Sequence, residues 1–224
     1  MVSRMSAEIR EFPPAVTPKA PKSAEQLGIL VLDGSGSMND PDAYGRGTKA
    51  EAVGKAVQEL VGRLQKSSRK QDFWLALIVF DNNVEVRLQP TPVTDIDGSN
   101  MRANPYLGGS TAIGDALYAA SQMADDFLTK KVDLPRSVVI MLMSDGQNNT
   151  GRDPRSVIND IKKKWSSDKL NNLNIVSVAY GADADRETLK AIVTNPEKDF
   201  CETDQSEKLR DFFLGSIVRR ETPT

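Results

Sequence analysis

Hydrophobic and polar positions follow two different periodicities along the chain, and these predict strands and helices in turn. Nearly continuous apolar runs are typical of strands buried on both faces, and they occur at 27–33, 73–80, 138–143 and 175–180. Between these runs, apolar residues recur every three to four positions, which predicts helices with one buried face. The expected helices are 48–66, 112–130, one that begins at Asp153-Pro154, a short one at 186–193 and a last one at 206–218, with a further strand near 199–202.

The segment 84–88 differs from the other strands because its apolar and polar residues alternate with period two. It follows the turn Asp81-Asn82-Asn83, so we expect a hairpin with 73–80 and therefore an antiparallel edge strand. The alternation of strands and helices elsewhere indicates an α/β fold. The predicted architecture is a doubly wound, mostly parallel six-stranded sheet of Rossmann-like form, with one antiparallel edge strand and helices on both faces.

The ends of the chain differ from this pattern. Residues 1–24 include Pro13, Pro14, Pro18 and Pro21, mixed with polar residues such as Lys19, Lys22 and Ser23. Such a stretch cannot bury enough apolar surface to offset its ordering entropy, so we expect a disordered or loosely docked tail. Residues 25–220 are predicted to form the folded domain, and residues 221–224 a short second tail.

Composition narrows the class of protein. Of the 224 residues, 39% are hydrophobic and 27% are charged, which is the balance of a globular protein with a real core. The formal net charge of −2 gives no basic excess that would favour nucleic acid. No apolar run reaches the roughly 18 residues of a membrane span, and no apolar leader follows Arg4. With only one cysteine, we expect a cytoplasmic protein.

Oxygen-bearing side chains gather at the ends of two predicted strands. Asp33, Ser35 and Ser37 follow the first strand, Asp145 follows 138–143, and Thr111 lies in the loop before 112–130. If strand 27–33 is central and 138–143 lies beside it, the strand order reverses between them, and ligands bind beyond the carboxyl ends at such a point. We therefore expect these five residues to form a metal site. Gly34 and Gly36 are expected to allow the backbone dihedrals that point the three side chains inward.

The chain contains no histidine, which excludes a His-containing catalytic triad and a His-ligated zinc site. A site made of carboxylates and hydroxyls favours a hard cation, so Mg²⁺ is the expected ion, with Ca²⁺ and Mn²⁺ as alternatives.

Asp33-x-Ser35-x-Ser37, Thr111 of Gly-Gly-Ser-Thr and Asp145 of Ser-Asp-Gly, in this order, resemble the metal-ion-dependent adhesion site of von Willebrand factor A domains. The resemblance covers about residues 26–220. The stretches 84–90 and 209–213 are also similar to compact bacterial TerY-type proteins, from which the proline-containing tail departs. The resemblance implies a domain that binds a partner protein. Asp33, Ser35, Ser37 and Thr111 would approach the ion, Asp145 would act through water, and an acidic side chain of the partner would complete the coordination. It also implies a role in bacterial stress or tellurite and other toxic-anion resistance.

The alternative is a Mg²⁺-dependent phosphoryl-transfer or hydrolytic enzyme on a similar sheet. An aspartyl-phosphate enzyme would need a second acid where this chain has Ser35, and the chain has no Gly-x-x-x-x-Gly-Lys-Ser/Thr phosphate loop. We therefore predict a binding module without catalysis, with no nucleic acid and no membrane span among its interactions.

Overall fold

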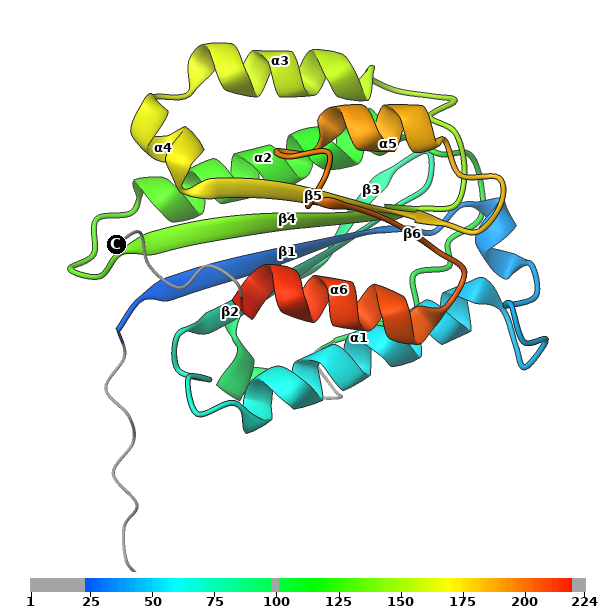
Figure 1. Cartoon of the computed structure of the whole chain (residues 1–224), viewed down its shortest axis with the longest axis horizontal. Helices are drawn as coiled ribbons and strands as arrows, with labels where there is room; N and C mark the ends of the chain where they lie inside the picture. Colours follow the sequence, from blue (N-terminus) through cyan, green and yellow to red (C-terminus); the bar gives the residue numbers. More distant parts are fainter. Residues whose placement is uncertain (1–22, 98–100, 219–224) are drawn as a thin grey trace, which may run out of the picture.

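A computed structural model describes residues 23–97 and 101–218, and it contains the predicted alternation of strands and helices (Figure 1). The strands are β1 Glu25–Asp33, β2 Phe73–Phe80, β3 Val84–Pro92, β4 Arg136–Ser144, β5 Leu173–Tyr180 and β6 Phe200–Thr203. The helices are α1 Lys49–Lys66, α2 Ile113–Thr129, α3 Pro154–Lys164, α4 Ser167–Asn171, α5 Arg186–Ile192 and α6 Ser206–Val218, with 3₁₀ turns at η1 Gly36–Asn39 and η2 Val93–Asp95.

The six strands form one sheet in the order β3-β2-β1-β4-β5-β6. All neighbours are parallel except β2 and β3, which are antiparallel. Leu30 of β1 is in register with Leu77 of β2 on one side and with Met141 of β4 on the other. This order confirms that the first strand is central and that the strand order reverses between β1 and β4.

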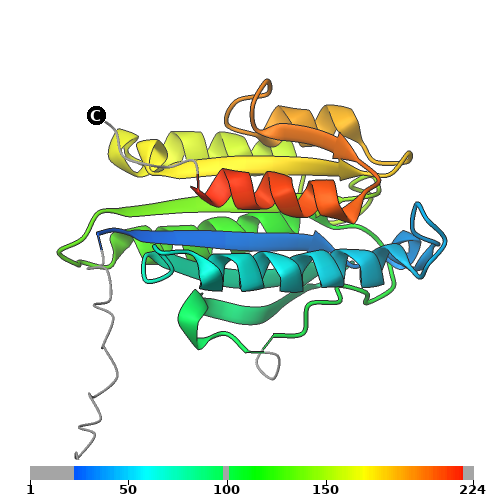
Figure 2. The same ribbon diagram turned by 60° about the horizontal axis from the view of Figure 1, so that its bottom comes forward.

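Helices cover both faces of the sheet. Helices α1 and α6 pack on one face, and α2, α3 and α5 pack on the other (Figures 1 and 2). Successive residues of β1 enter opposite cores, as strand geometry requires: Leu30 joins the α1 and α6 side and Val31 the other side. The apolar stripes predicted for α1, α2 and α6 are buried, so helical periodicity identified the correct faces.

Two differences from the sequence prediction concern short or irregular segments. Strand β3 continues to Pro92 rather than ending near 88. An edge strand tolerates proline, and the pairing of β2 with β3 is also interrupted by register shifts beside Leu75 and Leu77. Helix α4 was not predicted because five residues are too few to show helical periodicity. Apart from Ser23 and Ala24, the predicted N-terminal tail lies outside the described residues, as does the predicted tail 221–224.

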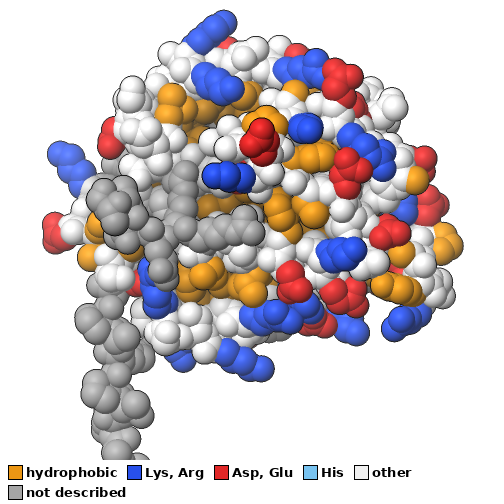
Figure 3. Space-filling view, in the orientation of Figure 1, with side chains coloured by type: hydrophobic (Ala, Val, Ile, Leu, Met, Phe, Trp, Pro, Cys, Tyr) orange, Lys and Arg blue, Asp and Glu red, His pale blue; other side chains and the backbone are white. Residues whose placement is uncertain are grey.

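The surface carries charges of both signs. On the face that presents α1 and α6, basic and acidic side chains are interspersed (Figure 3). Within residues 23–97 and 101–218, no helix is long and apolar enough to cross a membrane.

Candidate metal centre

The candidate site lies where the two central parallel strands end side by side. Leu32 of β1 is in register with Met143 of β4, so the loops that begin at Asp33 and Ser144 leave the sheet together. Asp33 and Asp145 are both buried, with exposed fractions of 0% and 1%. The topology therefore brings the two predicted carboxylates to one place, as the reversal of strand order requires.

The first loop is held by its own carboxylate. Asp33 Oδ1 accepts a hydrogen bond of 2.9 Å from the backbone N–H of Ser35. The hydroxyl oxygens of Ser35 and Ser37 lie 3.3 Å apart, close enough to share a hydrogen bond. This turn leads directly into the 3₁₀ segment η1 and keeps the three oxygen donors together.

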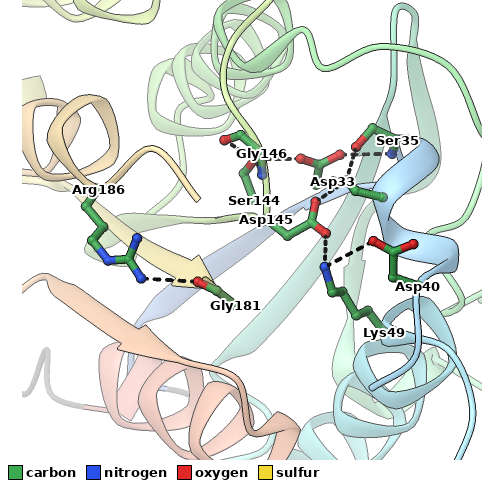
Figure 4. Close-up of polar contacts among 10 residues, drawn as sticks. Asp33, Ser35, Asp40, Lys49, Ser144, Asp145, Gly146, Gly181 and Arg186 are labelled. Atoms are coloured by element: carbon green, nitrogen blue, oxygen red, sulfur yellow. Dashed lines mark hydrogen bonds and ion pairs between the residues drawn. The ribbon is translucent and has the colours of Figure 1, made fainter. Parts of the chain in front are cut away.

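Side chains from β4 and its loop connect to this first loop. Ser37 Oγ donates to Asp145 Oδ1 at 2.7 Å. Ser144 Oγ donates to Asp33 Oδ2 at 2.5 Å, and it accepts from the N–H of Gly146 at 3.2 Å. Figure 4 shows Asp33, Ser144 and Asp145 gathered at this end of the sheet. Ser144 was not predicted as a site residue, although it orients the most deeply buried carboxylate.

Thr111 lies in the same region but does not cap helix α2. The N-cap is Ala112, which makes no side-chain cap. Instead, Asn149 Oδ1 accepts from the N–H of Thr111 at 2.8 Å, and Asn148 Oδ1 accepts from the N–H of Gly114 at 3.2 Å. The Thr111 hydroxyl is therefore not used as a helix cap. It lies beside the loop that carries Asp145, because a Cβ added to Gly146 would be 3.3 Å from it.

The explanation expected for the two glycines of the first loop is wrong. Neither Gly34 nor Gly36 has a positive φ. Gly34 is required by close packing, because a Cβ there would lie 2.1 Å from the carbonyl oxygen of Pro105. Its own carbonyl accepts hydrogen bonds from the N–H groups of Leu107 and Gly108, at 2.8 and 2.9 Å. Gly34 therefore joins the first loop to the loop that carries Thr111.

Burial controls the charge of Asp33. Loss of solvent on burial raises the pKa of Asp33 to about 6. The hydrogen bonds from Ser144 and Ser35 lower the pKa and offset part of this rise, whereas the nearby negative charge of Asp145 adds to it. A buried carboxylate of this kind is stabilised by a cation more strongly than an exposed one.

The donor set fits a hard divalent ion. Each carboxylate oxygen of Asp33 and Asp145 has one hydrogen-bond donor, and a carboxylate has about four lone-pair sites. Lone pairs therefore remain on both groups, and the hydroxyls of Ser35, Ser37 and Thr111 add oxygens of the kind that Mg²⁺ accepts. Within the described part of the chain, no three His, Cys, Asp or Glu side chains are grouped as metal ligands, so the hydroxyls would be essential to such a site.

A lysine that the sequence did not suggest also belongs to this region. Lys49 Nζ donates to Asp145 Oδ2 at 2.8 Å and lies 3.8 Å from Asp40 Oδ2 (Figure 4). The Lys49 side chain is 15% exposed and that of Asp145 is fully buried. The two residues are 96 positions apart, so no local pattern could have revealed the pair.

Two hollows lie elsewhere on the molecule. They have volumes of about 240 and 160 Å³, and Lys130 and Arg136 line both of them. Arg136 begins β4, at the opposite end of that strand from Asp145. The candidate metal centre is therefore identified by its donors, away from these two hollows.

Comparison with known proteins identifies the family and the fold. The family model described as "von Willebrand factor type A domain" matches residues 29–214. No curated protein matches the chain.

Solved structures with the same fold include proximal thread matrix protein 1 from the mussel byssus, described with a zinc-occupied MIDAS motif. It has 21% identity and a TM-score of 0.62, over 87% of this chain and 45% of that one. The pilus adhesin SpaC from Lactobacillus rhamnosus GG has 15% identity and a TM-score of 0.68, over 90% and 31%. The conserved hypothetical protein BatB from Bacteroides thetaiotaomicron has 15% identity and a TM-score of 0.58, over 88% and 98%.

This chain spans less than half the length of the mussel protein and of the adhesin. At these identities the structures show a shared fold, whereas the family model covers most of the chain. The chain belongs to the von Willebrand factor type A domain family, whose members are metal-binding modules for adhesion and protein interaction.

Proposed function

We propose that this chain is a divalent-metal-dependent protein-binding module, in which Asp33, Ser35, Ser37, Thr111 and Asp145 hold the ion. The observation that carries the proposal is the convergence of two buried carboxylates with serine hydroxyls at the end of the sheet. The zinc-occupied MIDAS motif named for the mussel protein supports a divalent ion in this family. For this chain we propose Mg²⁺, with Ca²⁺ and Mn²⁺ as alternatives, because all of the donors are oxygens.

A bound ion would supply a coordination position for a carboxylate of the partner. The chain's own residues would hold that ion in a fixed place. Asp33 is oriented by Ser144 and by the N–H of Ser35, and Asp145 is oriented by Ser37. Groups that are held in this way lose little conformational entropy on binding.

We also propose that the module is not an enzyme. Ser35 stands where an aspartyl-phosphate enzyme would need a second acid, and its N–H is engaged with Asp33. No histidine is present to act as a general base. The single cysteine supports a cytoplasmic location, and the resemblance to TerY-type proteins supports a role in a bacterial stress or toxic-anion resistance system. Both stay predictions.

Calorimetry with Mg²⁺ and Mn²⁺ tests the metal site. Asp33→Asn keeps the shape of the side chain but removes its charge, so we expect metal binding to be lost while circular dichroism is unchanged. The matched control is Asp72→Asn. Asp72 is also buried, and it directly precedes β2, at the opposite end of the strands from the candidate metal centre, where it accepts hydrogen bonds from Ser23 and Arg69. Equal metal affinity in Asp33→Asn and the wild-type protein would contradict the assignment.

Partner binding needs a separate test. A partner protein captured without crosslinking, by pull-down from the native cell on the wild-type domain, should be released by EDTA and should not be captured by Asp33→Asn. Retention of the same partner in EDTA would contradict metal-dependent binding. Phosphatase activity that disappears in Asp33→Asn but persists in Asp72→Asn would favour the enzyme alternative.

A further inference from the structure

Lys49 occupies an unfavourable position for a cation within its own helix. It is the first residue of α1, directly after the N-cap Thr48. The positive end of the helix dipole lies there, so local preferences favour an acid, as Glu51 in the same turn illustrates. A residue that breaks a local rule is typical of a functional position.

The loop before α1 fixes this placement. The N–H of Lys49 donates to the carbonyl of Asp40 at 2.9 Å, and Pro41 and Thr48 form an antiparallel bridge. The N–H of Asp42 donates to the carbonyl of Gly47 at 2.9 Å. The start of α1 is thus attached to the loop that leaves the candidate metal centre, and Lys49 is held close to Asp145.

The contacts of the ammonium explain what it can do. Its nearest acceptor is the buried oxygen Asp145 Oδ2 at 2.8 Å, whereas Asp40, at 3.8 Å, has a side chain that is 62% exposed. An ammonium so close to a carboxylate neutralises it and repels a second cation. Figure 4 shows Lys49 between Asp145 and Asp40.

We propose that Lys49 is a fixed counter-cation of the metal centre, which weakens the binding of the ion alone and selects an anionic group on the partner. This inference rests on the proposed function. The buried carboxylates of Asp33 and Asp145 balance a divalent ion, so Lys49 leaves the buried part of the loaded site with one positive charge in excess. The exposed Asp40 carboxylate, 3.8 Å from the ammonium, offsets this charge only from the solvent side, where water screens it. A carboxylate of the partner restores neutrality, so the ion and the partner bind more tightly together than either binds alone.

The experiment measures Mn²⁺ affinity by calorimetry in wild-type protein and three variants. Lys49→Gln removes the charge, and Lys49→Arg keeps it. Lys55→Gln removes an equal charge from an exposed position of the same helix. We expect Lys49→Gln to bind Mn²⁺ about tenfold or more tightly than the wild type. Lys49→Arg and Lys55→Gln should stay within about threefold of the wild type.

A second measurement uses acetate as the carboxylate probe and acetamide as its neutral match. Acetate should tighten Mn²⁺ binding to the wild-type protein, after correction for acetate bound to free Mn²⁺, and acetamide should not. In Lys49→Gln the effect of acetate should be much smaller. The comparison of acetate with acetamide in the wild type needs no variant, so it tests the inference even if Lys49→Gln does not fold.

The outcomes separate the inference from the function on which it rests. If the wild type binds Mn²⁺ and Lys49→Gln binds it equally or more weakly, the role of Lys49 is wrong and the metal centre stands. If acetate has no effect on the wild type, selection of an anionic partner is wrong. If the wild type binds no ion and Lys49→Gln binds one, the lysine itself fills the place of the cation, and the proposed function is overturned.

Discussion

Replacement of Gly34 by alanine tests how the first loop is joined to the loop that carries Thr111. A Cβ at this position would lie 2.1 Å from the carbonyl oxygen of Pro105 and 3.0 Å from Val79 Cγ1. Pro105 is buried and the near atom is backbone, so rotation of a side chain cannot relieve the clash. The loop must instead move away by roughly 1 Å, as overpacked sites do.

The cost follows from the contacts that this movement breaks. Overpacking costs about 1–3 kcal/mol, and the two hydrogen bonds from Leu107 and Gly108 to the Gly34 carbonyl contribute roughly 0.5–1.5 kcal/mol each. We therefore expect Gly34→Ala to lower the free energy of unfolding by about 2–6 kcal/mol. It should also weaken metal binding, because Thr111 lies on the displaced loop.

Gly36→Ala is the matched control in the same motif. Its Cβ would meet only the carbonyl oxygen of Gly109, at an ordinary contact distance of 3.6 Å. We expect this variant to lose less than about 1 kcal/mol. Urea denaturation followed by circular dichroism gives both values, and calorimetry with Mn²⁺ gives the affinities. Equal costs for the two variants would refute the argument that close packing, rather than loop flexibility, requires Gly34.

Two further predictions concern the charge and the support of the site. Burial raises the pKa of Asp33 to about 6 in the folded protein, so protonation of this carboxyl favours the folded state. In EDTA its contribution to the free energy of unfolding is fully present below pH 3.8 and is lost as the pH rises through 6. Because a proton on Asp33 competes with the ion, Mn²⁺ affinity should fall below pH 6, by up to about tenfold per pH unit. Calorimetry that gives the same Mn²⁺ affinity from pH 5 to 7 would contradict the argument from burial. Asn149→Ala removes the acceptor for the N–H of Thr111 and should cost about 1 kcal/mol in urea denaturation. The exposed neighbour Gln147→Ala should change stability by less than about 0.5 kcal/mol, and equal costs would mean that Asn149 does not support Thr111.

The fold could be predicted because its signals are local. Buried strands such as 73–80 are continuous apolar runs, and α1 shows its stripe of Val53, Val57 and Leu60 at helical spacing. These patterns indicate which residues are buried, and the burial of apolar side chains largely decides the class of fold. The strand order was only assumed from the sequence, with the hairpin of β2 and β3 placing β3 at one edge, and the structure confirms that β1 and β4 lie side by side.

The candidate donors could be predicted for a related reason. Asp33, Ser35 and Ser37 lie within five residues, and Asp145 comes directly after a strand end. Once the strand order is known, parallel strands bring these ends together without any detailed geometry.

Contacts between residues far apart in sequence were decided only by the tertiary structure. Ser144 reaches Asp33 across 111 positions, Asn149 reaches Thr111 across 38, and Lys49 reaches Asp145 across 96. In the sequence Lys49 reads as an ordinary polar residue at the start of a helix, and Gly34 as a flexible one. Side-chain contacts depend on the register of neighbouring strands and on the path of each loop. The sequence by itself therefore indicated which oxygen donors gather at the end of the sheet. The packing of the loops decided which lysine, backbone groups and glycine hold them in place.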